Sequence, residues 1–142
     1  MNCWKKYIAS LDHYEQMRDD LSHDAEAAHV PEELATNLEV GFEEAVVNVI
    51  NYSGSEHIWI KTTVDAHFFN IEIIDHGVEF NPLVINDPRA FDDSPIEERE
   101  PGGFGIFLIK ETFEKLEYAR EDFEGASANH LSLSLRIDQN EI

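Results

Sequence analysis

The stretch NLEVGFEEAVVNVINYSG, residues 37–54, has two different faces at the period of an α-helix. One face is apolar and is expected to pack against a sheet; it carries Leu38, Phe42, Ala45, Val46 and Val49. The other face has short amides, an acid and a glycine where a solvated helix would carry long charged side chains: Asn37, Gly41, Glu44, Asn48 and Asn51. A partly buried asparagine needs a partner or costs about 1–3 kcal/mol. Such a helix either lines a polar site or has its asparagines hydrogen-bonded within the protein.

The other patterns along the chain supply the sheet. Alternating or short apolar runs predict strands at 3–10, 57–64, 67–75, 115–122 and 129–137. Helical spacing predicts helices at 11–29, about 31–52 and about 104–115. The order is β-α-α-β-β-loop-α-β-β, which predicts an α/β sandwich of the α+β class: a mostly antiparallel mixed sheet with helices on one face. We expect residues 1–142 to form a single domain.

The loop between the two halves has no periodicity. Residues 81–101 are rich in proline, aspartate and glutamate. Loops of about 20 residues are unusual in compact domains and often act as lids over a site.

Charge and composition exclude several classes of function. The chain has 10 basic and 30 acidic residues, a net charge of −20, which opposes direct binding to nucleic acid or anionic membranes. The acidity fits either solubility or a partner with a basic surface. One cysteine, Cys3, excludes an intramolecular disulfide and fits a cytoplasmic location. We find no apolar run of about 18–20 residues, no signal peptide and no HExxH-type metal motif.

Two further motifs favour a ligand site. In IEIIDHGVEFNP, a strand runs into Asp75, whose carboxylate can accept from an amino group, and Gly77 lets a ligand approach the backbone. GGFG at residues 102–105 precedes a helix and offers free N–H groups and a positive dipole end to a phosphate. Each motif alone also fits an ordinary turn, and the second is not a Walker A loop.

In this order the three motifs resemble the N, G1 and G2 boxes of the Bergerat (GHKL, histidine kinase-like) ATP-binding fold. Within that superfamily, EEAVVNVINYS, DHGVEFNPL and PIEEREPGGFGIFLIKETFEKLEY resemble the RsbW-type anti-sigma factors, which are serine/threonine kinases. NHLSLSLRI is similar to their closing strand, so the resemblance covers about residues 5–137.

The resemblance implies a role for each motif residue. Glu44 would be the general base, Asn48 the ligand of Mg²⁺, and Asp75 the acceptor of the adenine amino group of ATP, with Gly77 beside the base. The lid, about residues 81–103, and the helix start would hold the phosphates through Gly102, Gly103 and Gly105. The remaining expected binding residues are Asn51, Phe80, Arg99 and Phe104.

By the same resemblance the protein would be a cytoplasmic, Mg-ATP-dependent protein serine/threonine kinase in transcription regulation by partner switching. It would hold a sigma factor or similar regulator inactive and phosphorylate a STAS-domain anti-sigma antagonist. The resemblance also allows a homodimer, and the length of 142 residues suits the single-domain branch of the superfamily. Glu100 in the lid and Tyr52 at the end of the helix favour the alternative, a non-catalytic nucleotide-sensing module that sequesters a regulatory partner.

Overall fold

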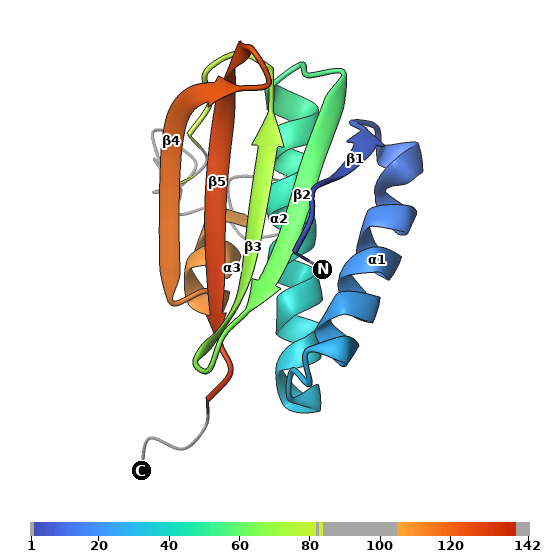
Figure 1. Cartoon of the computed structure of the whole chain (residues 1–142), viewed down its shortest axis with the longest axis vertical. Helices are drawn as coiled ribbons and strands as arrows, with labels where there is room; N and C mark the ends of the chain where they lie inside the picture. The colour runs from blue at the N-terminus through green and yellow to red at the C-terminus, as the bar shows by residue number, and fades with distance from the viewer. Residues whose placement is uncertain (1, 82, 84–104, 139–142) are drawn as a thin grey trace, which may run out of the picture.

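The sheet of this protein is built from five strands in the described residues, and they lie in the order β1-β2-β3-β5-β4 (Figure 1). The structure is a computed structural model that describes residues 2–81, 83 and 105–138. The strands are β1 (Lys5–Ile8), β2 (His57–Val64), β3 (Phe68–Asp75), β4 (Lys115–Phe123) and β5 (Ala126–Arg136). Every described pairing is antiparallel. The predicted fold class is therefore confirmed, with an antiparallel sheet in the part described.

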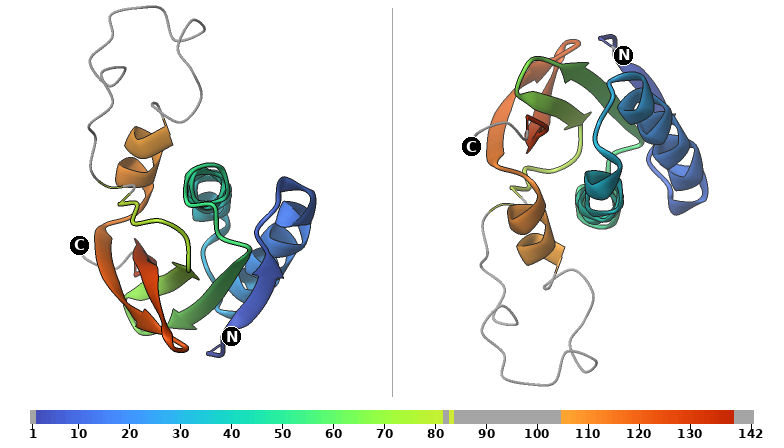
Figure 2. Two further views of the ribbon diagram at one scale, coloured as in Figure 1. Left: turned by 90° about the horizontal axis from the view of Figure 1, so that it is seen from above. Right: turned by 90° about the horizontal axis from the view of Figure 1, so that it is seen from below.

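The helices cover one face of that sheet, as the sequence predicts. They are α1 (Tyr14–Ala27), preceded by the 3₁₀ turn η1 (Leu11–His13), then α2 (Glu32–Tyr52) and α3 (Gly105–Thr112). Views along the strands show all three α-helices on the same side, with α2 between α1 and α3 (Figure 2). None of the described helices has the length and apolar character needed to cross a lipid bilayer.

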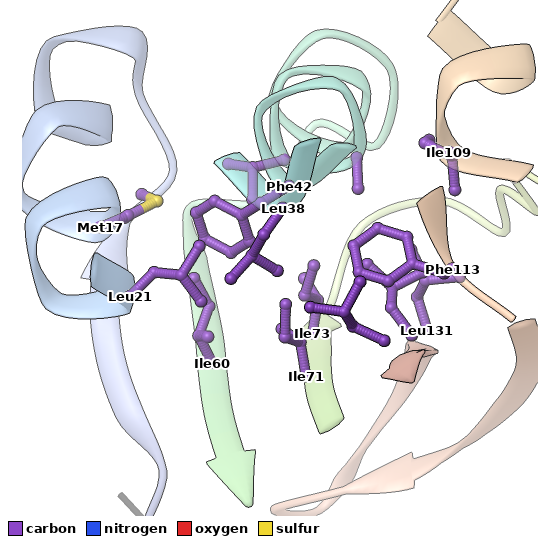
Figure 3. Packing of buried hydrophobic residues seen from close by; sticks show 14 of the residues in the cluster. Met17, Leu21, Leu38, Phe42, Ile60, Ile71, Ile73, Ile109, Phe113 and Leu131 are labelled. Atoms are coloured by element: carbon purple, nitrogen blue, oxygen red, sulfur yellow. The ribbon is translucent and has the colours of Figure 1, made fainter. Parts of the chain in front are cut away.

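The main core lies between the helices and the sheet. The apolar face of α2 is buried there, because all five of its predicted core residues are at most 3% exposed. Phe42 and Leu38 point from α2 toward Ile71 and Ile73 of the central strand β3 (Figure 3). Since β3 pairs with neighbours on both sides, the core fixes α2 across the middle of the sheet.

The opposite face of the sheet carries a smaller aromatic cluster. Trp59 of β2 packs against Phe123, with ring centroids 5.5 Å apart, and Trp4 lies 5.4 Å from Phe123. His76, directly after β3, lies 4.9 Å from Trp59 and makes a 2.8 Å hydrogen bond from Nε2 to the Phe123 carbonyl oxygen. The turn after β3 is therefore attached to this outer face as well as to the core.

Gly41 is the point where α3 packs on α2. A Cβ at Gly41 would lie 2.8 Å from Phe113 Cε2 and 3.3 Å from Thr112 Cβ. Phe113 is buried, so its ring has little room to move. The glycine on the polar face of α2 therefore has a structural reason, close helix packing.

We predict that Gly41→Ala destabilises the fold by about 1–3 kcal/mol, because the added methyl overpacks a buried contact. Helix propensity alone would predict the opposite, since alanine is favoured over glycine by about 1 kcal/mol inside a helix. Urea unfolding measures the difference. Thr36→Ala at an exposed position of α2 is the matched control and should be neutral or stabilising. A stabilised Gly41→Ala variant would contradict the packing argument.

Candidate functional site

Asn48 is the buried amide on the polar face of α2. It is 3% exposed, whereas Asn37 and Asn51 on the same face are exposed. Among the described residues, no hydrogen bond to the Asn48 side chain is present, and its amide atoms are not fully buried: in this part of the chain the buried polar side-chain atom without a partner is the Tyr14 hydroxyl. The sequence left open that the asparagines of this helix are hydrogen-bonded within the protein. For Asn48, the described residues provide no such hydrogen bond. Its amide is available to a ligand.

Glu44 lies one helical turn before Asn48 and is half-buried. Burial raises the pKa of its carboxyl, and the neighbouring charge of Glu43 raises that pKa further. A raised pKa brings a carboxylate closer to the range in which it can accept a proton during a reaction. The two residues therefore place a carboxyl group with a raised pKa and an amide on one face of α2.

Asp75 ends β3 with its side chain on the core side of the sheet, 2% exposed. Its Oδ1 accepts from the Gly77 N–H at 2.8 Å and from Asn129 Nδ2 at 3.0 Å. No donor among the described residues reaches Oδ2 in a hydrogen bond. The carboxylate is thus held by one oxygen, and the other can accept from a ligand.

Gly77 is required by the protein itself. A Cβ at Gly77 would lie 2.1 Å from the carbonyl oxygen of Ser53, directly after α2. That same oxygen accepts a hydrogen bond from the Val78 N–H at 2.8 Å. Nearby, the ring centroids of Tyr52 in α2 and Phe80 in the turn lie 5.6 Å apart. The sequence analysis explained Gly77 by room for a ligand. That explanation is incomplete, because the space that a side chain at residue 77 would need is occupied by the backbone at the end of α2.

This close contact joins the end of the Glu44–Asn48 helix to the turn that carries Asp75. Two motifs that are 27 residues apart, Asn48 and Asp75, are brought to neighbouring elements by it. The sequence predicts that they share one site, and the connection through Ser53 gives a physical basis for that arrangement.

Asn129 on β5 is a site residue that the sequence analysis missed. It is 4% exposed and pairs across the sheet with Asp75. Its Nδ2 also donates to the Val78 carbonyl at 2.8 Å, and its Oδ1 accepts from the Phe80 N–H at 3.1 Å. A signal existed, because Leu131, Leu133 and Leu135 alternate toward the core and the same alternation puts Asn129 on the core side.

Two side chains of β4 complete this network. Tyr118 donates its hydroxyl to Asn129 Oδ1 at 2.6 Å, and Arg120 donates to the same oxygen at 3.1 Å and to the Gly77 carbonyl at 2.8 Å. Burial raises the pKa of Tyr118, and the charge of Glu79 raises it further, so the hydroxyl keeps its proton. The β4–β5 hairpin thus clamps the whole turn after Asp75.

The other predicted binding residues lie at or beyond the edge of the residues that the structure describes. Gly105 is the first residue of α3. Most of the predicted lid, including Arg99, Gly102 and Gly103, lies outside the described residues, and so does Phe104. Their assignment stays a prediction.

A separate hollow of about 280 Å³ lies over the strands, with Thr63, Asn70, Lys115 and Ser134 in its lining. Its polar groups already pair with one another: Ser134 donates to Asn70 Oδ1 at 2.7 Å, and Asn70 Nδ2 donates to Thr63 at 3.4 Å. These side chains lie on the outer face of the sheet, away from Asp75 and Asn48.

The donor set fits magnesium better than a transition metal. In the described part of the chain, no three His, Cys, Asp or Glu side chains come together as a metal site. Magnesium needs few protein ligands, because it keeps waters and takes oxygens from a bound phosphate. The side chain of Asn48, which has no hydrogen-bond partner among the described residues, carries one such oxygen.

Comparisons with known proteins support the fold and give the family. The family model described as "Histidine kinase-like ATPase domain" matches residues 7–135. Among solved structures, the chain is similar to Acinetobacter baumannii histidine kinase AdeS, with a TM-score of 0.52 and 12% identity over 98% of this chain and 70% of the other. At that identity the likeness concerns the fold. No curated protein matches the chain in sequence.

The raised pKa of Glu44 predicts a pH-dependent stability. Because the folded state holds this proton more tightly than the unfolded state, ionising Glu44 destabilises the fold as the pH rises through the raised pKa. Glu44→Gln should therefore raise the melting temperature at pH 7. The gain should vanish below about pH 4, where an unfolded glutamate is protonated too.

Thermal melts from pH 3.5 to 8 measure this difference. Glu56→Gln, at an exposed position after α2, is the control and should give no such pH-dependent gain. A lower melting temperature for Glu44→Gln at pH 7 would mean that the carboxylate stabilises the fold.

Proposed function

The chain belongs to the family of histidine kinase-like ATPase domains, and from this premise we propose that it is an Mg-ATP-dependent protein serine/threonine kinase of the RsbW anti-sigma type. One observation carries the proposal. Asn48 is buried without a hydrogen-bond partner in the described residues, and Glu44, with its raised pKa, lies one turn away on the same helix face. An amide without an internal partner and a carboxyl with a raised pKa on one helix face favour a ligand and a reaction there.

In this proposal, Asp75 and Asn48 bind the nucleotide. Oδ2 of Asp75 accepts from the adenine amino group, while Oδ1 is held by Gly77 and Asn129. The Asn48 oxygen would hold Mg²⁺. When bound, the ion neutralises charge on the phosphates.

Glu44 acts on the protein substrate. It accepts the proton of a serine or threonine hydroxyl while that oxygen bonds to the γ-phosphorus of ATP. The bond between the γ-phosphorus and the bridging oxygen breaks, and ADP leaves. Desolvation of Glu44, which raises its pKa, makes it a stronger proton acceptor than an exposed glutamate.

The partners follow from the resemblance to anti-sigma factors. The protein sequesters a sigma factor or a similar regulator in the cytoplasm, and its phosphoryl acceptor is a STAS-domain antagonist. The net charge of −20 supports a regulator with a basic binding surface. A homodimer is part of the proposal and is tested by light scattering.

Phosphotransfer is tested by mixing the protein with Mg-ATP and the STAS-domain protein encoded beside it. Phosphate should appear on a serine or threonine of the STAS protein. A tight complex with intact ATP would instead identify a non-catalytic nucleotide sensor. Absence of nucleotide binding in titration calorimetry would overturn both functions.

For Asn48 we predict that Asn48→Ala abolishes magnesium-dependent ATP binding and leaves the melting temperature of the free protein unchanged or slightly higher. The reason is that the amide has no partner among the described residues, so its loss removes no internal hydrogen bond. Titration calorimetry with and without Mg²⁺ measures the effect. Asn37→Ala, an exposed amide on the same face three turns earlier, should bind like wild type. A lower melting temperature with unchanged ATP affinity would show that Asn48 is structural.

For Glu44 we predict that Glu44→Gln keeps ATP affinity within a few-fold and slows phosphotransfer by about 10²–10⁴-fold, the usual worth of a positioned base. The amide preserves the shape of the side chain but cannot accept the proton. A phosphorylation time course under saturating ATP measures the rate. Transfer at the wild-type rate would exclude Glu44 as the base.

A further inference from the structure

Asn129 has no hydrogen-bonding capacity left for a ligand. Its Nδ2 faces two acceptors, Asp75 Oδ1 and the Val78 carbonyl, and its Oδ1 faces three donors, from Phe80, Tyr118 and Arg120. Because each end of the amide meets only complementary partners, its orientation is fixed chemically. Any influence of Asn129 on a ligand must therefore pass through a neighbour.

That neighbour is the base-binding carboxylate. Asn129 and the Gly77 N–H both donate to Oδ1 of Asp75, so this oxygen is occupied and Oδ2 remains as an acceptor. An acceptor fixed in this way forms a hydrogen bond with a base that has an N–H donor and forms none with a base that lacks one. The remaining bonds of Asn129 hold Val78 and Phe80, so one side chain sets both the carboxylate and the turn that follows it.

We propose that Asn129 is a positioning residue that gives the site its selectivity for a base bearing an exocyclic amino group, by fixing Asp75 with Oδ2 toward the ligand. The proposal rests on the proposed function, because it assumes that an adenine nucleotide binds at Asp75. It goes further in placing the origin of selectivity in β5, outside the three motifs of the sequence.

The test compares ATP with purine riboside triphosphate, whose base lacks the amino group. By titration calorimetry, wild type should bind ATP at least about 10-fold more tightly than the analogue, the scale of a hydrogen bond to a charged group. Asn129→Ala should bring the two affinities within about 3-fold and weaken ATP more than the analogue. A merely structural role would weaken both nucleotides by the same factor and keep the ratio.

If Asn129→Ala does not fold, a second variant, Asn129→Asp, tests the same positioning role. Asn129→Asp preserves shape but sets a second carboxyl against Asp75, so that the pair binds one proton more readily. The charged and titratable groups around it are Asp75 on β3, Tyr118 and Arg120 on β4, and Glu79 in the turn. The ATP preference of this variant should be small at pH 8 and recover toward pH 5.5, where the introduced carboxyl is protonated and donates to Asp75. The wild-type ratio should stay flat over this range.

The control is Asn70→Ala, an asparagine of β3 that bonds to Thr63 and Ser134 on the outer face. It should keep the wild-type preference. If wild type binds neither nucleotide, the proposed function and this inference both fail. If wild type prefers ATP and Asn129→Ala keeps that full preference, or the Asn129→Asp preference does not change with pH, the positioning role is overturned and the proposed function stands.

Discussion

The contact between Gly77 and Ser53 is the constraint on which the candidate site depends. The backbone of the turn after β3 approaches the end of α2 so closely that a Cβ would lie 2.1 Å from the Ser53 oxygen. The hydrogen bond from Val78 to that oxygen locks the two segments together. Because α2 is fixed across the sheet by its buried apolar face, the contact sets the distance between its polar face and Asp75. The core already packs α2 on β3, and this contact adds a direct link between the end of α2 and the turn after Asp75.

Two buried asparagines show how the same side chain serves different purposes. Asn129 makes five hydrogen bonds to its surroundings, so it belongs to the framework. Asn48 makes none within the described residues although it is equally buried. The Asn48 amide atoms keep contact with solvent, because the buried polar side-chain atom without a partner in the described residues is the Tyr14 hydroxyl and not Asn48. The contrast separates an asparagine that holds the framework from one whose side chain is free of hydrogen bonds within the described residues.

The turn after Asp75 is held from both faces of the sheet. Asn129 and Arg120 bind it on the core side, whereas His76 bonds to Phe123 and packs on Trp59 on the outer side. Except for Trp59 of β2, the residues that hold the turn in these contacts belong to the β4–β5 hairpin. A carboxylate on so rigid a support loses little freedom when a base binds, which is how preorganisation improves affinity and selectivity.

The sequence by itself determined the fold class, the element order and the motif residues. The alternation of β2 and β3 and the two faces of α2 are local patterns, and the strand and helix bounds follow them within a few residues. Glu44, Asn48 and Asp75 are predicted from short motifs that are each local in sequence, and their roles stay predictions. Only the tertiary structure decided the roles of Asn129, Tyr118, Arg120 and Ser53, since hydrogen bonds between residues up to 54 positions apart leave no local pattern. It also decided why residues 41 and 77 are glycines, because the atoms that crowd them come from elements distant in sequence.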